Sequence, residues 1–105
     1  MTAKSKRDQI EAMLVDEPND PELRYMLAMD HVSAGDDAGA VHCFEQLIQV
    51  APNYPPGYHM AGRALQRLNR ISEARALLER GIPIAQKTGD HHAAGEMTEL
   101  LQTME

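Results

Sequence analysis

The sequence predicts an all-α protein, and three of its features support this fold class. Helix-favouring residues dominate, with 14 Ala, 10 Leu and 7 Met, whereas Val, Ile and Thr together number 13. Apolar residues recur at spacings of three and four, and no segment shows the alternation of a strand between turn signals. Proline, glycine and aspartate residues divide the chain into six short segments. We therefore expect about six helices and no strands.

The N-terminal half contains three expected helices, over about residues 6–15, 21–35 and 37–50. The first carries apolar residues on one face, and the second begins with a proline, which suits the first helical position. Each helix is preceded by a residue whose side chain can accept a hydrogen bond from the first-turn backbone. These predicted capping residues are Ser5 (in a capping box with Asp8), Asp20, and Asp36 or Asp37.

The C-terminal half contains three more expected helices. One covers residues 55–69 and places its two leading prolines in the first turn. Ser72 is predicted to cap the next, and Asp90 the last, which extends to residue 104 with an unbroken apolar stripe. Because only two to five residues connect successive helices, we expect neighbouring helices to pack antiparallel.

Pro83 conflicts with the helix in which it lies. A proline there removes one backbone hydrogen bond and clashes with the carbonyl of Glu79. We therefore expect either a kink around residues 81–83 or an early end to this helix.

Self-comparison reveals a period of 34 residues. This shift superimposes small residues on small residues at two places, and one large apolar residue on another. Shifting in the opposite direction places the first helix on the second helix of the following hairpin. The superimposed pairs include Leu27 and Ala61, Ala28 and Gly62, Ala40 and Ala74, and Phe44 and Leu78.

This pattern resembles the tetratricopeptide repeat family, whose repeat of about 34 residues is a helix–turn–helix hairpin. The resemblance implies a right-handed α-solenoid over residues 5–104, with a half-repeat helix (5–17), two full repeats (21–54 and 55–88) and a C-terminal capping helix (90–104). Arg24, His31 and Leu47 depart from the family pattern, which favours a large aromatic residue, Tyr and Ala at these positions.

Composition excludes several classes of protein. A chain of 105 residues suits one domain, and its net charge of −6 argues against nucleic-acid binding. A lone cysteine cannot form an internal disulfide, and no stretch is apolar enough for a membrane helix or a signal core. We expect a cytoplasmic protein that binds neither nucleic acid nor membrane.

Catalytic motifs are lacking, and we expect a protein without enzymatic activity, cofactor or metal. The sequence contains no phosphate-binding glycine loop, nucleophile elbow or zinc-protease motif. His91, His92 and Glu96 offer a remote alternative as a small metal site, but a polar first helical turn is the favoured interpretation, because four ligands at structural spacing are absent. Cys43 and His31 are interpreted as packing residues rather than as a nucleophile and a base.

The resemblance implies protein binding instead. Family members use the first helix of each hairpin to line a concave groove that holds peptides or partner helices. Tyr25, Met29 and Val32 suit an apolar anchor, and the arginines suit a carboxylate. The groove residues carried over from the family are Glu22, Tyr25, Met29 and Val32 from the first repeat and His59, Arg63, Gln66 and Arg67 from the second.

We therefore expect a protein or peptide partner that carries an acidic group beside an apolar anchor. The uneven charge agrees with this, because residues 1–52 carry 4 basic and 10 acidic side chains, whereas residues 53–105 carry 6 of each. The alternative is an assembly subunit that is a homo-oligomer, with the groove occupied by a second copy. The chain itself is expected to be a monomer or a weak homodimer.

Overall fold

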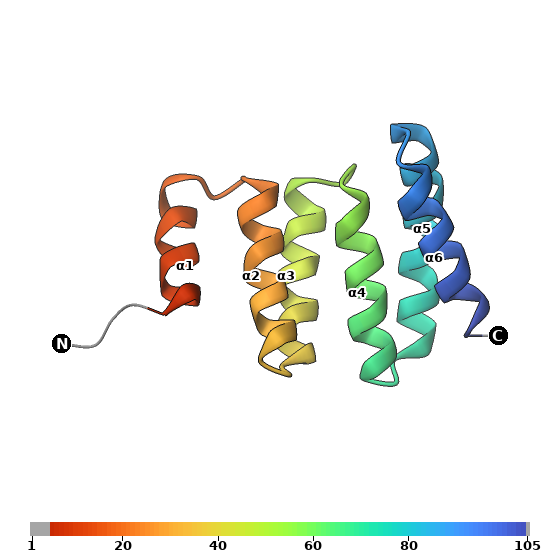
Figure 1. Ribbon diagram of the computed structural model, residues 1–105, viewed down its shortest axis with the longest axis horizontal. Coiled ribbons are helices and arrows are strands. Elements are labelled where there is room, and N and C mark those ends of the chain that lie inside the picture. Colours follow the sequence, from red (N-terminus) through yellow and green to blue (C-terminus); the bar gives the residue numbers. More distant parts are fainter. Residues whose placement is uncertain (1–4, 105) are drawn as a thin grey trace.

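The computed structural model describes residues 5–104, in which all regular structure is helical (Figure 1). Each helix runs antiparallel to the next, so the chain rises and falls along the long axis of the molecule. The predicted fold class, a solenoid of antiparallel helix hairpins, is thereby confirmed. The helices are α1 (Lys6–Asp16), α2 (Pro21–Ser33), α3 (Asp37–Val50), α4 (Pro55–Arg67), α5 (Ile71–Thr88) and α6 (His91–Gln102).

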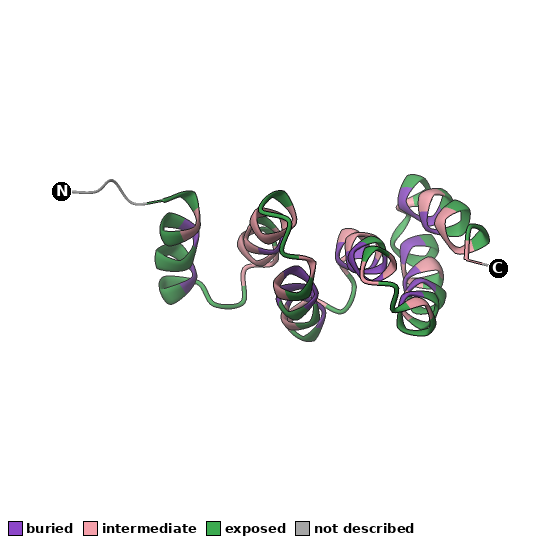
Figure 2. Ribbon diagram, turned by 90° about the horizontal axis from the view of Figure 1, so that it is seen from below, coloured by how far each residue is buried: buried purple, intermediate pink, exposed green. Residues whose placement is uncertain are grey.

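The helices form two rows. Each helix contacts its chain neighbours, and α4 also contacts both α2 and α6. By contrast, the backbone of α3 does not approach that of α1 or α5 as closely. Figure 2, a view along the helices, shows α2 above α3 and α6 above α5. The row of α2, α4 and α6 is therefore the closely packed, inner side of the solenoid, and we call its surface the concave face.

Side-chain caps fix where most helices begin. Ser5 and Asp8 form the predicted capping box at α1, and Asp20 accepts hydrogen bonds from two backbone N–H groups of α2. Asp36 and Asp90 cap α3 and α6 through Gly39 and Ala93 respectively. These interactions satisfy backbone donors that a helix leaves unpaired in its first turn.

The predicted Ser72 cap is wrong. Helix α5 begins at Ile71, and its N-cap residue is Arg70, whose side chain makes no capping hydrogen bond. Arg70 instead pairs with Glu73 at 2.6 Å across the first turn. The preceding Asn69 adopts a left-handed conformation with φ of 59°, which turns the chain early enough for the helix to start ahead of Ser72.

The predicted early end of α5 is also wrong, because the helix continues past Pro83 to Thr88. Tertiary packing explains its persistence. Gly81 and Ala85, on either side of the proline, are buried, while Pro83 itself is exposed. Gly89, with φ of 83°, ends the helix.

Helix contacts in the core depend on complementary sizes. A Cβ atom on Gly81 would lie 2.6 Å from Cβ of Tyr58, which is fully buried. Leu47 of α3, one repeat before Gly81, packs instead on Gly57 of α4 in the next repeat, where a Cβ atom would lie 3.2 Å from Leu47 Cδ2. The missing side chain at Gly57 explains how the chain tolerates Leu47 where the repeat favours a small residue.

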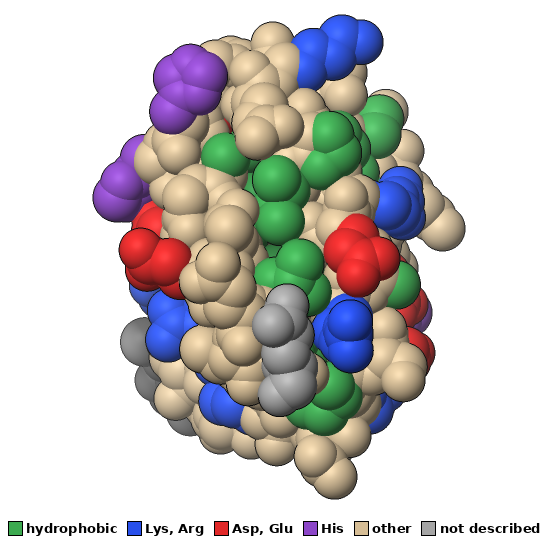
Figure 3. Space-filling view, turned by 90° about the vertical axis from the view of Figure 1, so that its right-hand side faces the viewer, with side chains coloured by type: hydrophobic (Ala, Val, Ile, Leu, Met, Phe, Trp, Pro, Cys, Tyr) green, Lys and Arg blue, Asp and Glu red, His purple; other side chains and the backbone are tan. Residues whose placement is uncertain are grey.

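The surface at the end formed by α5 and α6 carries both apolar and charged side chains (Figure 3). Figure 3 shows a strip of apolar side chains between these helices, with charged side chains on both sides of it. Within residues 5–104, no helix combines the length and the hydropathy that crossing a bilayer requires. The half-buried apolar residues of α5 and α6 include Leu77, Ile82, Ile84, Leu100 and Leu101.

Candidate functional site

Two adjoining hollows lie on the concave face, where α4 meets α6. The first, of about 300 Å³, also reaches α2. The second, of about 290 Å³, extends toward the C-terminal end of α6, and His59, Arg63 and Glu96 line both. The other lining residues are Tyr25, Pro56, Met60, Asp90, His92 and Ala93 in the first hollow and Gln66, Glu99, Leu100 and Thr103 in the second.

Tyr25 forms the aromatic wall of the first hollow. Its ring packs against Phe44 and Tyr54, with centroids 6.2 Å and 6.0 Å apart, in the tilted and edge-on arrangements that aromatic pairs favour. Burial raises the pKa of the Tyr25 phenol, so the hydroxyl stays neutral at physiological pH. The ring is therefore a fixed apolar surface with one polar end.

His59 and Arg63 lie one turn apart on α4 and differ in charge. Burial is the main cause that lowers the pKa of His59. The negative charge of Glu96 raises this pKa, whereas Arg63 and His92 lower it further. The His59 imidazole is thus neutral at pH 7. Arg63 is exposed and makes no hydrogen bond or ion pair within residues 5–104. The α4 wall consequently presents one guanidinium that is free to bind a carboxylate.

The α6 wall is acidic. Glu96 Oε1 lies 2.6 Å from His92 Nε2, and Glu99 has no hydrogen-bond or ion-pair partner in the described part of the chain. The Asp90 carboxylate caps α6 by accepting from the Ala93 N–H at 3.1 Å. From the sequence, Glu96 is considered only as a metal ligand and Asp90 only as a cap, and α6 is not placed in the groove.

Four of the eight residues expected in the groove line the hollows, namely Tyr25, His59, Arg63 and Gln66. Gln66 also donates a hydrogen bond to Thr103 Oγ1 at 3.2 Å, which ties α4 to the end of α6.

The other four expected residues lie elsewhere, and Glu22 lines the corner between α1 and α2 instead. Met29 and Val32 are half-buried against the core and line neither hollow. Arg67 is paired with Asp37 at the start of α3, with 2.9 Å between Nη2 and Oδ1. Arg63 and Arg67 therefore do not form one strip of free donors.

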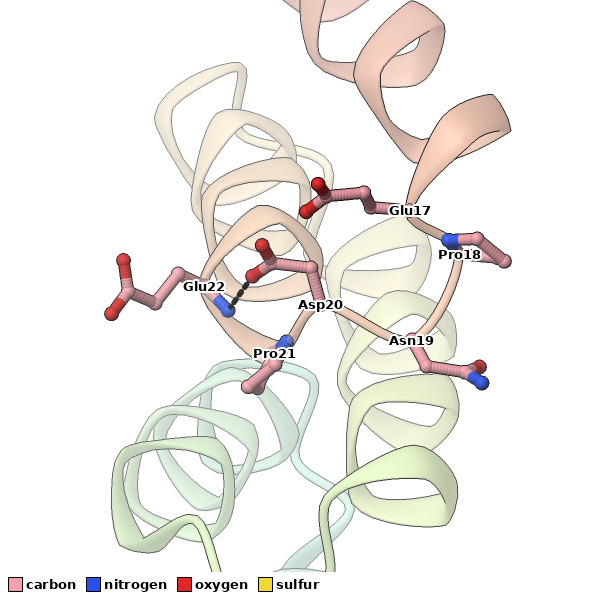
Figure 4. A pocket seen from close by; sticks show the side chains of 6 residues that line it. All are labelled: Glu17, Pro18, Asn19, Asp20, Pro21 and Glu22. Atoms are coloured by element: carbon pink, nitrogen blue, oxygen red, sulfur yellow. Dashed lines mark hydrogen bonds between the residues drawn. The ribbon is translucent and has the colours of Figure 1, made fainter.

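A larger open hollow, of about 460 Å³, lies at the corner between α1 and α2 (Figure 4). Residues 17–22 alone line it, so it is the inside of a single turn rather than a site assembled from several helices. The Asp20 carboxylate there accepts from the Glu22 N–H at 2.9 Å and is committed to capping α2. We therefore place the candidate site on the concave face.

The histidines and the cysteine have structural surroundings. His31 Nδ1 lies 3.0 Å from Asp36 Oδ2, and Cys43 is 7% exposed in the core. Burial raises the pKa of the Cys43 thiol, the opposite of what an activated nucleophile requires. Among residues 5–104, no three His, Cys, Asp or Glu side chains are grouped to hold a metal ion.

Comparison with known proteins yields consistent matches. The family model described as tetratricopeptide repeat matches residues 31–95, more than half of the chain. A TPR repeat-containing protein of Pseudomonas aeruginosa is 29% identical over 96 residues, which cover 91% of each chain. A tetratricopeptide repeat domain protein from Salinibacter ruber, solved by NMR, is 30% identical, with a TM-score of 0.78 over 84% of this chain and 89% of that one.

A more distant match shares the fold. The type III secretion chaperone SycD of Yersinia enterocolitica, solved in complex with a peptide of the translocator YopD, has a TM-score of 0.85 and 16% identity. The match covers 93% of this chain and 76% of that one.

Proposed function

The chain belongs to the tetratricopeptide repeat family, and from that premise we propose that it is a protein-interaction module that holds a peptide segment or a partner helix on its concave face. The family is typically non-enzymatic, and the proposed role needs no cofactor. The binding groove consists of the two hollows between α2, α4 and α6.

One observation carries this proposal. Apolar surface from Tyr25 and Met60 adjoins Arg63 and Glu99, two charged side chains without a partner in residues 5–104. A partner that fills the hollow would bury the apolar surface and pair with these charges, which gives both affinity and specificity. That SycD was solved with a peptide supports the same kind of ligand for this chain.

The direct test selects peptide ligands from a displayed random library on the immobilised chain and maps the strongest binder by amide chemical shifts. We expect the shifts to centre on α4 and α6 around Arg63 and Glu99. Arg63→Glu should weaken the binder, whereas Arg75→Glu, the same reversal on the exposed side of α5, should not.

Two results would count against the proposal. Shifts confined to the α1–α2 corner or to the end formed by α5 and α6 would move the site off the concave face. Concentration-dependent dimers that Arg63→Glu dissociates would instead show that a second copy occupies the groove.

A further inference from the structure

The three helices of the concave face differ in chemical character. Helix α2 contributes the apolar ring of Tyr25, held in place by Phe44 and Tyr54. Helix α4 contributes the free guanidinium of Arg63, and α6 contributes the carboxylates of Glu96 and Glu99. From α2 to α6, the face therefore changes from aromatic to cationic to anionic.

The charged side chains are available to a ligand. Arg67, the other arginine at the end of α4, forms an ion pair with Asp37. Its charge is therefore neutralised, and Arg63 is the cation that α4 presents to a ligand. Arg63 and Glu99 are both exposed, and neither makes a hydrogen bond or ion pair in the described residues. A ligand that pairs with them displaces no interaction among residues 5–104.

The dimensions favour an extended segment. Each hollow measures about 300 Å³ or less, which accommodates side chains rather than a helix of ~10–12 Å diameter. Packed helices lie ~8–10 Å apart. An extended segment in the polyproline II conformation advances ~3.1 Å per residue with three residues per turn, so every third side chain lies on the same face, about 9 Å from the last. Side chains that reach consecutive helices are therefore about three residues apart.

We propose that the groove, if it functions as suggested above, selects an extended segment in which an apolar, an acidic and a basic residue follow one another at intervals of about three residues. The apolar side chain packs on Tyr25, the acidic one pairs with Arg63, and the basic one pairs with Glu99. The sequence predicts a partner with an acidic group beside an apolar anchor. A basic residue now joins them as the third element of that partner.

The test uses peptides of equal composition that differ only in order. One set has Leu, Glu and Lys at three-residue intervals in a Ser/Thr background, synthesised in both chain directions; the other exchanges Glu and Lys. We expect one direction of the first set to bind about tenfold more tightly than any exchanged peptide at low salt, because two charge pairs become two repulsions. The difference should shrink as salt rises.

A charge exchange in the protein provides the matched control. The double variant Arg63→Glu with Glu99→Arg should reverse the preference and favour the exchanged peptides. Both side chains are exposed, so the variant should retain its helicity, which circular dichroism checks. A third variant, Tyr25→Ala, should weaken all orders alike.

The outcomes separate this inference from the proposed function. Equal affinity for all orders, or an unchanged preference in the exchanged variant, would overturn the inference while binding at the concave face stands. If neither these peptides nor a library-selected ligand perturbs the concave face, both are overturned.

Discussion

Arg24 of α2 and Tyr58 of α4 occupy equivalent positions in successive repeats, and each donates a hydrogen bond to the carbonyl oxygen of a proline six residues earlier. Arg24 Nε lies 2.8 Å from Pro18 O, and Tyr58 Oη lies 2.7 Å from Pro52 O. Both bonds fix the loop that enters the first helix of the repeat. The arginine that departs from the aromatic pattern therefore preserves the interaction with a different donor.

This relationship predicts the effect of Tyr58→Phe. The ring stays buried, but the Pro52 carbonyl loses its donor, and we expect a loss of about 0.5–1.5 kcal/mol in the free energy of unfolding. Urea denaturation measures it. Tyr54→Phe is the matched control, because the Tyr54 hydroxyl makes no hydrogen bond within residues 5–104, and its effect should stay within about 0.5 kcal/mol. Equal losses in the two variants would contradict this assignment.

Gly62 offers a second prediction, because a Cβ atom there would lie 2.7 Å from Leu78 Cδ2 in the fully buried contact between α4 and α5. Gly62→Leu should therefore cost about 1–3 kcal/mol by overpacking. Gly95 lies in α6 with open space around it, so Gly95→Ala should stabilise the protein by about 0.5–1 kcal/mol. Denaturation curves distinguish the two by sign, and a stabilising Gly62→Leu would refute the close approach.

Much of this fold could be predicted because its signals are local and repeated. Ser5, Asp20 and Asp90 each cap a helix, and a capping residue can be read from the sequence next to it without knowledge of the rest of the fold. The 34-residue period then assigns each segment to a hairpin. Ser72 misled the prediction because a favourable capping residue competes with the turn geometry set by Asn69, which local propensity does not reveal.

The site was less predictable, because its character depends on pairs of distant residues. The sequence shows that Arg63 and Arg67 share a helix but not that Asp37, 30 positions earlier than Arg67, neutralises one of them. The acidic wall was missed because α6 matches the repeat only after a shift of about two residues. With that shift, Glu99 falls at the position of Arg63, so the signal was present in the sequence.

Pro83 provides a third prediction. It is exposed inside a continuous helix, so Pro83→Ala restores a backbone hydrogen-bond donor without removing core packing. Proline costs ~3 kcal/mol in a helix interior, but it also restricts the unfolded chain by ~0.4–1 kcal/mol. We expect a net gain of about 2–2.6 kcal/mol in the free energy of unfolding, measured by thermal or urea denaturation. Reduced stability would show instead that the proline ring contributes to the packing of α5.

His59 predicts how stability depends on pH. Its pKa in the folded protein is lower than the usual 6.5, chiefly because of burial. The unfolded chain therefore binds a proton at His59 more readily than the folded chain does. As a result, the free energy of unfolding falls as pH decreases below about 6.5. Above that pH His59 is neutral in both states and does not make stability depend on pH. The free energy of unfolding should decline between pH 7 and pH 5.5.

Two variants isolate this contribution. His59→Gln cannot be protonated, so its stability should fall less over the same pH interval than that of the unaltered protein. Arg63→Gln removes a nearby positive charge that lowers the His59 pKa, and it should reduce the decline in part, because the folded state then accepts the proton more easily. Urea titrations at pH 7 and pH 5.5 provide the comparison. An equal decline in His59→Gln would assign the pH dependence to other groups, and a steeper decline in Arg63→Gln would reverse the sign inferred for this pair.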